Sequence, residues 1–278
     1  MRVVITGASG FLGGALFRHL TAAGLDCLGV SRTNSPDLYQ VASYAETPPG
    51  DCLIHCAETN DRGVANAVGK ALEIEAHNTL SALLTKNFSH VIYVSSAVLY
   101  GDLWTTPRKV TDHVYVIDTY TRVKRISEIS VLEHGGSVVR LANLYGPGMA
   151  ATNVLSHILN QLGQDRTITM HALDPVRDFL WIDDVVSALS ILSQKQIAGV
   201  FNVGSGRGIS IGELVGLAQR AAGTHQSVSG LRTLDQPSHL VLDITATSQH
   251  LGWSPQTPLE VGVRELVKMN MKSGTQTL

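Results

Sequence analysis

Tyr120 and Lys124 lie four positions apart in a stretch, residues 119–134, whose pattern predicts a helix. Side chains at this spacing share one face of a helix, so the two groups can act together. A nearby ammonium favours phenolate over phenol, and it can also hold the ribose of a nicotinamide nucleotide. Ser96 ends a predicted strand and could hydrogen-bond the same substrate oxygen as the tyrosine. The three side chains therefore predict proton transfer that accompanies hydride transfer at a carbinol or ketone.

A glycine-rich turn near the start of the chain indicates a binding function. Val3–Thr6 predicts a buried strand, helical periodicity begins at Phe11, and Gly7, Gly10 and Gly13 follow the strand at three-residue spacing. Such glycines let the chain turn, let the backbone approach a pyrophosphate, and let the helix pack on the strand. Free N–H groups at the helix N-terminus attract the phosphate. The alternative, which the pattern alone leaves open, is an ordinary tight turn between strand and helix.

The elements that must position these residues alternate between strand and helix, which predicts a doubly wound sheet. Nearly unbroken apolar runs suit a parallel sheet that is covered on both faces. The expected strands are 3–6, 27–30, 38–42, 52–57, 91–96 and 138–141. The expected helices are 11 to about 24, 65–87 and 119–134. The segment between 31 and 52 leaves room for a short strand but hardly for a crossover helix.

Beyond residue 148 the alternation loosens, which indicates a second lobe. The later helices are expected at 154–162, from a cap at Asp183 to about 194, at 211–222 and at 258–272. The later strands are expected at 179–182, 200–203 and near 239–242, and the polar tail from 272 is expected to fray. We assign 1–148 plus about 179–203 to a dinucleotide-binding domain, and 149–178 plus about 204–278 to a substrate-binding lobe.

Composition excludes several classes of protein. A chain of 278 residues that is 44% hydrophobic suits one large domain or a domain with a smaller lobe. A formal net charge of −2 gives no strong attraction to nucleic acid or to an anionic membrane. The sequence contains no membrane-length apolar stretch and no room for a signal peptide ahead of the first strand. Three cysteines in apolar runs suit a reducing compartment, so we expect a cytoplasmic protein.

Seven sequence blocks have the order and spacing of a known family. They are Thr6–Gly13, Val94–Gly101, Tyr120–Lys124, Arg140–Gly148, Arg177–Asp184, Phe201–Gly206 and Leu251–Pro255. On these motifs nearly the whole chain resembles the extended short-chain dehydrogenases/reductases that act on nucleotide sugars. The resemblance implies an α/β fold with a Rossmann-type doubly wound parallel sheet and a smaller C-terminal α/β substrate lobe. It also implies a homodimer, in which the helices around 71–87 and 119–134 pair with their copies.

The resemblance assigns roles to individual residues. It makes Ser96, Tyr120 and Lys124 catalytic, with Ser96 also on the substrate. Asn143 and Arg177 are expected in the pocket of the nucleotide-sugar substrate, with Arg177 on a phosphate. The helix asparagine of the family, which positions the lysine through water, corresponds to Asn78. The expected cofactor contacts are Gly7, Ser9, Gly10, Phe11, Leu12, Gly13, Ser31, Arg32, Cys56, Ala57, Asn78, Tyr120 and Lys124.

Ser31 and Arg32 stand where the second strand ends, beside the expected adenosine ribose. An acid at this place would bind the ribose hydroxyls, whereas an arginine can accommodate a 2′-phosphate. The sequence therefore favours NADP over NAD as the cofactor. The alternatives are that Arg32 is a solvated loop residue, or that it stacks on adenine and leaves the 2′ position unread. Ser43 and Tyr44 replace the aspartate that the family usually carries after its third strand.

Two departures from the family restrict the reaction. Ala97 and Val98 stand where sugar 4,6-dehydratases carry an Asp-Glu pair, and the Cys/His pair of the epimerase-reductases is missing. Reduction of a 4-keto-6-deoxy sugar nucleotide remains, or 4-epimerisation with tightly bound NAD. Arg32 favours the reductase, because epimerases of this type usually keep NAD. A dinucleotide-binding regulator without turnover is the alternative from another class.

Two further motifs are interpreted as structural. Gly208–Gly212 matches a nucleophile elbow, with Asp235 and His239 in the order of hydrolases. Ser210 and Glu213 also form a capping-box pattern, which we favour. His55, His77, His90 and His113 have no histidine four positions later, and the three cysteines lack the paired spacing of zinc sites. We therefore expect no metal site. His55, in a buried strand, is expected to pack near the cofactor.

Overall fold

The computed structural model describes residues 1–274, so the end of the polar tail, 275–278, lies outside the described residues. In this part of the chain a seven-stranded sheet has the order β10-β6-β5-β4-β1-β2-β3, and every pairing in it is parallel. Its strands are β1 (Val3–Thr6), β2 (Cys27–Ser31), β3 (Tyr39–Gln40), β4 (Cys52–His55), β5 (His90–Ser96), β6 (Ser137–Leu141) and β10 (Gly199–Val203). The Rossmann-type sheet is confirmed.

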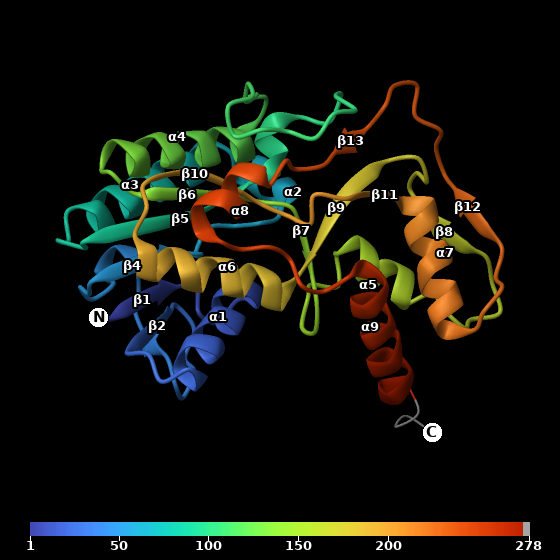
Figure 1. Ribbon diagram of the computed structural model, residues 1–278, viewed down its shortest axis with the longest axis horizontal. Helices are drawn as coiled ribbons and strands as arrows, with labels where there is room; N and C mark the ends of the chain where they lie inside the picture. Colours follow the sequence, from blue (N-terminus) through green and yellow to red (C-terminus); the bar gives the residue numbers. More distant parts are fainter. Residues whose placement is uncertain (275–278) are drawn as a thin grey trace.

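Helices cover both faces of this sheet, and the strand sequences explain why. Successive strand residues point to opposite faces, so a strand covered on both sides is apolar at every position. Ile5 and Ile54 enter the core cluster formed with α1 and α6, whereas Val4 and Leu53 enter the cluster formed with α3 and α4. Figure 1 shows the two helix pairs on either side of the sheet. Their bounds are α1 (Phe11–Ala22), α3 (Lys70–Leu84), α4 (Thr119–Glu133) and α6 (Ile182–Lys195).

The strand order reverses between β1 and β4, which sets the place of the site. At such a switch point the loops after neighbouring strands diverge, and a crevice opens at the carboxyl ends of the strands. The loop after β1 and the segment after β4 therefore lie side by side. Between β2 and β4 the chain forms only β3 and the short 3₁₀ helix η1 (Tyr44–Glu46), so the expected lack of a crossover helix is confirmed.

Two local expectations are wrong. The helix expected at 65–87 is divided into α2 (Arg62–Val68) and α3, because Gly69 between them has φ +65°, a left-handed conformation that ends the first helix. Helix α6 begins at Ile182 with Trp181 as its N-cap, so Asp183 lies in the first turn and is not the cap. Its carboxylate instead accepts a hydrogen bond from the Trp181 indole at 2.8 Å.

The remaining elements form a second group at the right of Figure 1, with its own core. Strand β9 pairs with β7, β11 and β13, while β8 pairs with β12. The bounds are β7 (Asn143–Tyr145), α5 (Val154–Leu159), β8 (Ile168–Met170), β9 (Val176–Trp181), β11 (Gly208–Ser210), α7 (Ile211–Ala222), β12 (Val228–Gly230), β13 (His239–Leu240) and α9 (Leu259–Gly274).

One C-terminal helix packs away from this second group. Helix α8 (Thr245–Leu251) contacts β10 and α6, and Leu251 and Trp253 are buried in the core beside the central sheet. The expected division into a dinucleotide-binding domain and a substrate lobe stays a proposal. It assigns 245–253 to the substrate lobe, although this segment packs beside the central sheet. Across the described residues, every helix is too short or too polar to span a membrane. The expected cytoplasmic location stays a prediction.

Candidate active site

The glycine loop after β1 packs closely against backbone atoms of the segment after β4 and of the loop itself. Gly7 has φ +73°, and a Cβ on it would lie 2.9 Å from the carbonyl oxygen of Cys56. A Cβ on Gly13 would lie 2.3 Å from the carbonyl oxygen of Gly7. These contacts require glycine at both positions, so the loop carries no side chain there. Helix α1 starts at Gly10 without a side-chain cap and without an acid in its first turn, so its N–H groups can bind an anion.

The other expected cofactor residues of this region lie around the loop. Ser9 is exposed, and its hydroxyl accepts a hydrogen bond from Ser31. Phe11, Leu12 and Cys56 are half-buried against the core cluster that includes α1, and Ala57 follows Cys56 directly. The loop thus fits a dinucleotide: its backbone is open to a pyrophosphate at the point where the sheet divides.

Tyr120 and Lys124 lie on α4 in the geometry that their spacing predicts. Asp118 and Thr121 form a capping box that starts the helix, and Asn66 of α2 accepts a hydrogen bond from the Tyr120 backbone N–H at 3.1 Å. Both side chains are buried, and the Lys124 Nζ lies 5.9 Å from the centre of the Tyr120 ring. The lysine therefore reaches the tyrosine from one turn along the helix.

Glu58, three residues beyond β4, is a site residue that sequence reasoning missed. Its Oε2 lies 3.0 Å from the Nζ of Lys124, and both side chains are less than a tenth exposed. Lys124 also donates to the carbonyl oxygen of Val94 at 3.1 Å. Burial by itself would raise the pKa of Glu58, but the Lys124 ammonium above all holds it below its usual value. The only signal in the sequence is that Glu58 directly follows the strand expected at 52–57.

His55 ends β4 beneath this pair. It is completely enclosed, and its Nδ1 shares a 2.8 Å hydrogen bond with the hydroxyl of Thr6 on β1. Burial, opposed by the Glu58 carboxylate and helped by the Lys124 ammonium, lowers the pKa of His55 to about 4. The imidazole is therefore neutral at pH 7 and fastens β4 to β1 beside the glycine loop.

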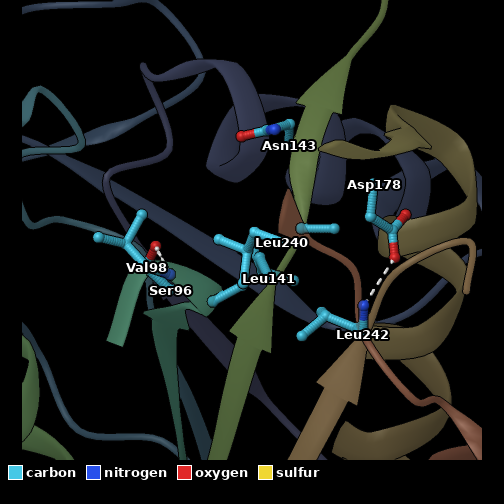
Figure 2. Close-up of a pocket in the computed structure, with 9 residues that line it drawn as sticks. Ser96, Val98, Leu141, Asn143, Asp178, Leu240 and Leu242 are labelled. Carbon is cyan, nitrogen blue, oxygen red and sulfur yellow. Dashed lines mark hydrogen bonds between the residues drawn. The ribbon is translucent and has the colours of Figure 1, made fainter. Parts of the chain in front are cut away.

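Ser96 and Asn143, both expected on the substrate, line one cavity at the carboxyl edge of the sheet (Figure 2). Ser96 caps the 3₁₀ helix η2 (Ala97–Tyr100) by accepting a hydrogen bond from the Val98 N–H at 3.2 Å, so its own hydroxyl proton can be donated to a ligand. The cavity of about 40 Å³ holds a water molecule rather than a sugar. A substrate must therefore widen it or lie at its mouth.

Asp178 closes the other side of this cavity and is a second residue that sequence reasoning missed. Its carboxylate accepts from the N–H groups of Ser205, Gly206 and Leu242, as Figure 2 shows for Leu242. Burial raises the pKa of Asp178, and these hydrogen bonds act in the opposite direction. The side chain fastens the glycine-rich loop after β10 to the segment after β13, which makes its role structural.

Arg177, the neighbouring residue on β9, does not project freely toward a substrate phosphate. Its guanidinium donates to the Asp102 carboxylate at 3.0 Å and to the Ser238 hydroxyl at 2.7 Å. These residues lie in two loops, after η2 and before β13, so the arginine joins them. Asp102 therefore occupies part of the guanidinium, and the expected phosphate contact stays a prediction.

The two residues expected at the adenosine ribose, Ser31 and Arg32, differ in their exposure to solvent. Ser31 is completely enclosed, and its hydroxyl accepts from the Thr33 N–H at 3.0 Å. Arg32 is exposed, lies over the Tyr44 ring and forms a 3.3 Å ion pair with Glu75 of α3. Asn78 is exposed three residues further along α3, and its water-mediated role stays a prediction. Glu75 of α3, although distant in sequence, thus places a carboxylate beside the end of β2, where the sequence itself has no acid.

The remaining motifs are structural. Ser210 and Glu213 form the expected capping box at the start of α7, with the Glu213 N–H donating to the serine hydroxyl at 3.1 Å. This confirms the interpretation that the Gly208–Gly212 pattern starts a helix. Among the described residues, no group of three or more His, Cys, Asp or Glu side chains is arranged to hold a metal ion.

Comparison with known proteins adds relatives to this geometry. The model of the NAD dependent epimerase/dehydratase family matches residues 3–204. GDP-6-deoxy-D-mannose reductase from Pseudomonas aeruginosa is 27% identical over 296 residues, which cover 96% of each chain. UDP-glucuronic acid decarboxylase 4 from Arabidopsis thaliana is 25% identical over 302 residues, which cover 96% of this chain and 68% of the relative.

Solved structures share the fold at lower identity. UDP-glucose 4-epimerase from Thermotoga maritima superposes with a TM-score of 0.85 at 21% identity and covers 98% of this chain and 99% of its own. RMD from Pseudomonas aeruginosa, solved with NADPH, superposes with a TM-score of 0.85 at 24% identity over the same shares. The α/β architecture of the chain is thus that of nucleotide-sugar enzymes.

We expect His55 to make stability depend on pH. The unfolded chain binds a proton at this histidine near pH 6.5, whereas the folded chain does not until about pH 4. Stability is therefore complete above pH 6.5 and falls as the pH decreases, by about 2 kcal/mol between pH 6.5 and 4.5. Urea unfolding of wild type and His55→Gln at both pH values measures this loss, which the variant should lack. His77→Gln, on the exposed part of α3, is the control. An equal loss of unfolding free energy between the two pH values in wild type and His55→Gln would refute the lowered pKa of His55.

Proposed function

The chain belongs to the NAD-dependent epimerase/dehydratase family, and on that premise we propose that it is an NAD(P)-dependent oxidoreductase acting on a nucleotide sugar. The reaction that we infer is reduction of a 4-keto-6-deoxy sugar nucleotide. The observation that carries this proposal is the Lys124 ammonium, buried beside Tyr120 at the carboxyl edge of the sheet and paired with Glu58. The similarity to a reductase over nearly the full length of both chains supports the choice.

The chain's own groups divide the work as follows. The backbone of the glycine loop and the N-terminus of α1 would hold the pyrophosphate of a nicotinamide dinucleotide. When bound, that group supplies a hydride to a substrate carbon or removes one. Lys124 has an N–H left for the ribose, because Val94 and Glu58 take two of its three donors. Tyr120 donates its hydroxyl proton to the keto oxygen, and Ser96 hydrogen-bonds the same oxygen.

The residues of η2 favour reduction over dehydration. Elimination needs an acid and a base beside the sugar, and Ala97 and Val98 offer neither. Asn143, which lines the same cavity as Ser96, would contact the sugar, and Arg177, which now pairs with Asp102, would bind a phosphate.

The proposal is tested with purified protein, NADPH and a panel of nucleotide 4-keto-6-deoxy sugars. Reduction of one of them consumes NADPH, which is followed by absorbance of the reduced nicotinamide. Interconversion of 4-epimers without net loss of nicotinamide would replace the reductase by an epimerase. Tight dinucleotide binding without turnover on any nucleotide sugar would point to a regulator that has kept the fold.

Tyr120→Phe should lower turnover by about 10²–10⁴-fold while the fold survives, because the ring stays and the proton donor is lost. Steady-state kinetics give the loss, and circular dichroism shows whether the helices are intact. Tyr145→Phe is the matched control. That tyrosine is buried in the second core, and its hydroxyl has no hydrogen-bond partner in the part of the chain that is described. Near-normal turnover in Tyr120→Phe would remove the residue from the mechanism.

We propose NADP as the cofactor, because Arg32 is exposed at the end of β2 and its guanidinium can bind a 2′-phosphate. NADPH should bind at least about tenfold more tightly than NADH. Arg32→Ala should remove most of this preference by weakening NADPH. Glu75→Gln should increase it, because the carboxylate competes for the guanidinium and repels the phosphate.

Fluorescence titration of both nucleotides against these variants measures the preference. Glu73→Gln, which removes an acid from the same helix where it pairs with Arg122, is the control and should leave the ratio unchanged. Equal weakening of NADPH and NADH by Arg32→Ala would mean that the arginine stacks on adenine. The assignment to NADP would then be lost.

We also propose a homodimer through α3 and α4. Ile74, Ile126 and Ile129 are exposed on these helices, with 39–53% of each side chain accessible. Covering such side chains against a second copy removes apolar area from water. Light scattering should show a dimer at micromolar concentration, and Ile126→Lys with Ile129→Lys should shift it to monomer. Leu231→Lys, an exposed residue of the second lobe, should not. A monomeric wild type would contradict the proposal.

A further inference from the structure

Glu58 is a buried carboxylate that no motif of the chain identified, and it touches the catalytic lysine. We propose that Glu58 is the positioning residue of Lys124, which holds the ammonium charged and in register with Tyr120. This inference rests on the proposed function, since it concerns the same site. It goes beyond the serine, tyrosine and lysine that the sequence motifs identify.

The contacts of Glu58 come from two different elements of the fold. One carboxylate oxygen accepts from Lys124 at 3.0 Å and from the hydroxyl of Tyr93 on β5. The other accepts from Ser127 of α4 at 3.0 Å. Lys124 and Ser127 are three residues apart and so lie on one face of the helix. The carboxylate therefore fixes both the position of the ammonium and the rotation of the helix that bears Tyr120.

The surroundings of Lys124 make this contact decisive for its charge. Cys56, Tyr93 and His55 face the ammonium, besides Tyr120 on its own helix. Burial raises the pKa of the Cys56 thiol to about 12 and that of the Tyr93 hydroxyl well above its usual value, while His55 has a pKa of about 4. All three are neutral at pH 7, so Glu58 is the neighbour that supplies negative charge.

Without that carboxylate the lysine would be a buried, unpaired cation. Burial by itself lowers the pKa of Lys124, and Glu58 above all raises it above its usual value. An ammonium left unpaired in an enclosed site loses its proton instead of staying charged. The donors of a neutral amine attract a ribose oxygen less strongly than those of an ammonium. The effect of removing Glu58 should therefore grow with pH.

The first test follows the lysine directly. ¹⁵N-lysine NMR of wild type and Glu58→Gln reports the titration of each ammonium, and Lys124→Arg identifies the signal. We expect Lys124 to titrate at a lower pH in Glu58→Gln than in wild type. An unchanged titration of Lys124 in the variant would overturn the proposal. This readout needs no substrate or cofactor, so it stands even if the proposed reaction is wrong.

The second test joins the charge to the function. Glu58→Gln should lose at least about tenfold in turnover at pH 8.5, recover part of it at pH 6.5, and keep KM for the sugar nucleotide within about twofold. Binding of reduced nicotinamide, measured by fluorescence, should weaken over the same pH range. A pH-independent loss of turnover would overturn the proposal, because it would mark a purely structural role.

Two further variants complete the design. Glu58→Asp keeps the negative charge with a shorter side chain, so it should retain the wild-type titration of Lys124 and the wild-type pH profile at reduced turnover. It also keeps the test decisive if Glu58→Gln does not fold, since loss of the wild-type pH profile in Glu58→Asp would overturn the proposal. Glu73→Gln, which removes a carboxylate that pairs with α4 at its surface, should leave both unchanged. A wild type that binds neither NADPH nor NADH would refute the proposed function, while the lysine titration would still decide the role of Glu58.

Discussion

Helix α4 carries charged side chains into a buried face of the protein, and the arrangement is stable only because each charge is paired. Glu128 is completely enclosed and accepts two hydrogen bonds from Arg140 of β6, at 2.7 and 2.8 Å, and one from Ser95 of β5. Two turns of helix away from the tyrosine, Glu128 thus joins α4 to the neighbouring strands β5 and β6. Removing one partner of such a pair would leave a buried charge uncompensated, which is strongly destabilising. The pairing thus fixes where the helix lies on the sheet.

The pairing of buried charges on α4 also determines where Lys124 and Tyr120 lie. Arg140 holds α4 through Glu128, and Glu58 holds it through Lys124, so both contacts fix the rotation of the helix that carries Tyr120. The strand order reverses between β1 and β4, which is where such folds bind dinucleotides, and the glycine loop packs there against the carbonyl of Cys56. The site is therefore built where two requirements meet: backbone close enough for a phosphate, and a cation that burial cannot discharge.

Strand β9 organises the side of the site that faces the second lobe. Its neighbouring residues Arg177 and Asp178 point to opposite sides, as strand residues do. Asp178 fastens the loop after β10, and Arg177 joins Asp102 to Ser238. Asp102 thus occupies one of the terminal nitrogens of the Arg177 guanidinium, which is the group expected to bind a phosphate. Epimerases, decarboxylases and reductases are all found among the relatives, so the fold by itself does not decide the reaction.

The sequence by itself determined the features that depend on local spacing. Three features depend only on residues that are close together in the sequence. They are the strand, glycine turn and helix at the N-terminus, the shared helix face of Tyr120 and Lys124, and the capping box at Ser210. The apolar strands likewise predicted a sheet covered on both faces, because burial on two sides leaves no polar position. Their order along the chain was sufficient for the Rossmann-type architecture.

Only the tertiary structure decided which distant charges meet. Arg32 and Glu75 are 43 residues apart and Arg177 and Asp102 are 75 apart, so no spacing rule connects them. Glu58 reaches Lys124 because β4 lies between β1 and β5 in the sheet and α4 packs on β5. Ser31 was expected to face a ribose phosphate but is enclosed by its neighbours. A buried charge needs a partner, and the register of strands and helices decides which residue becomes that partner.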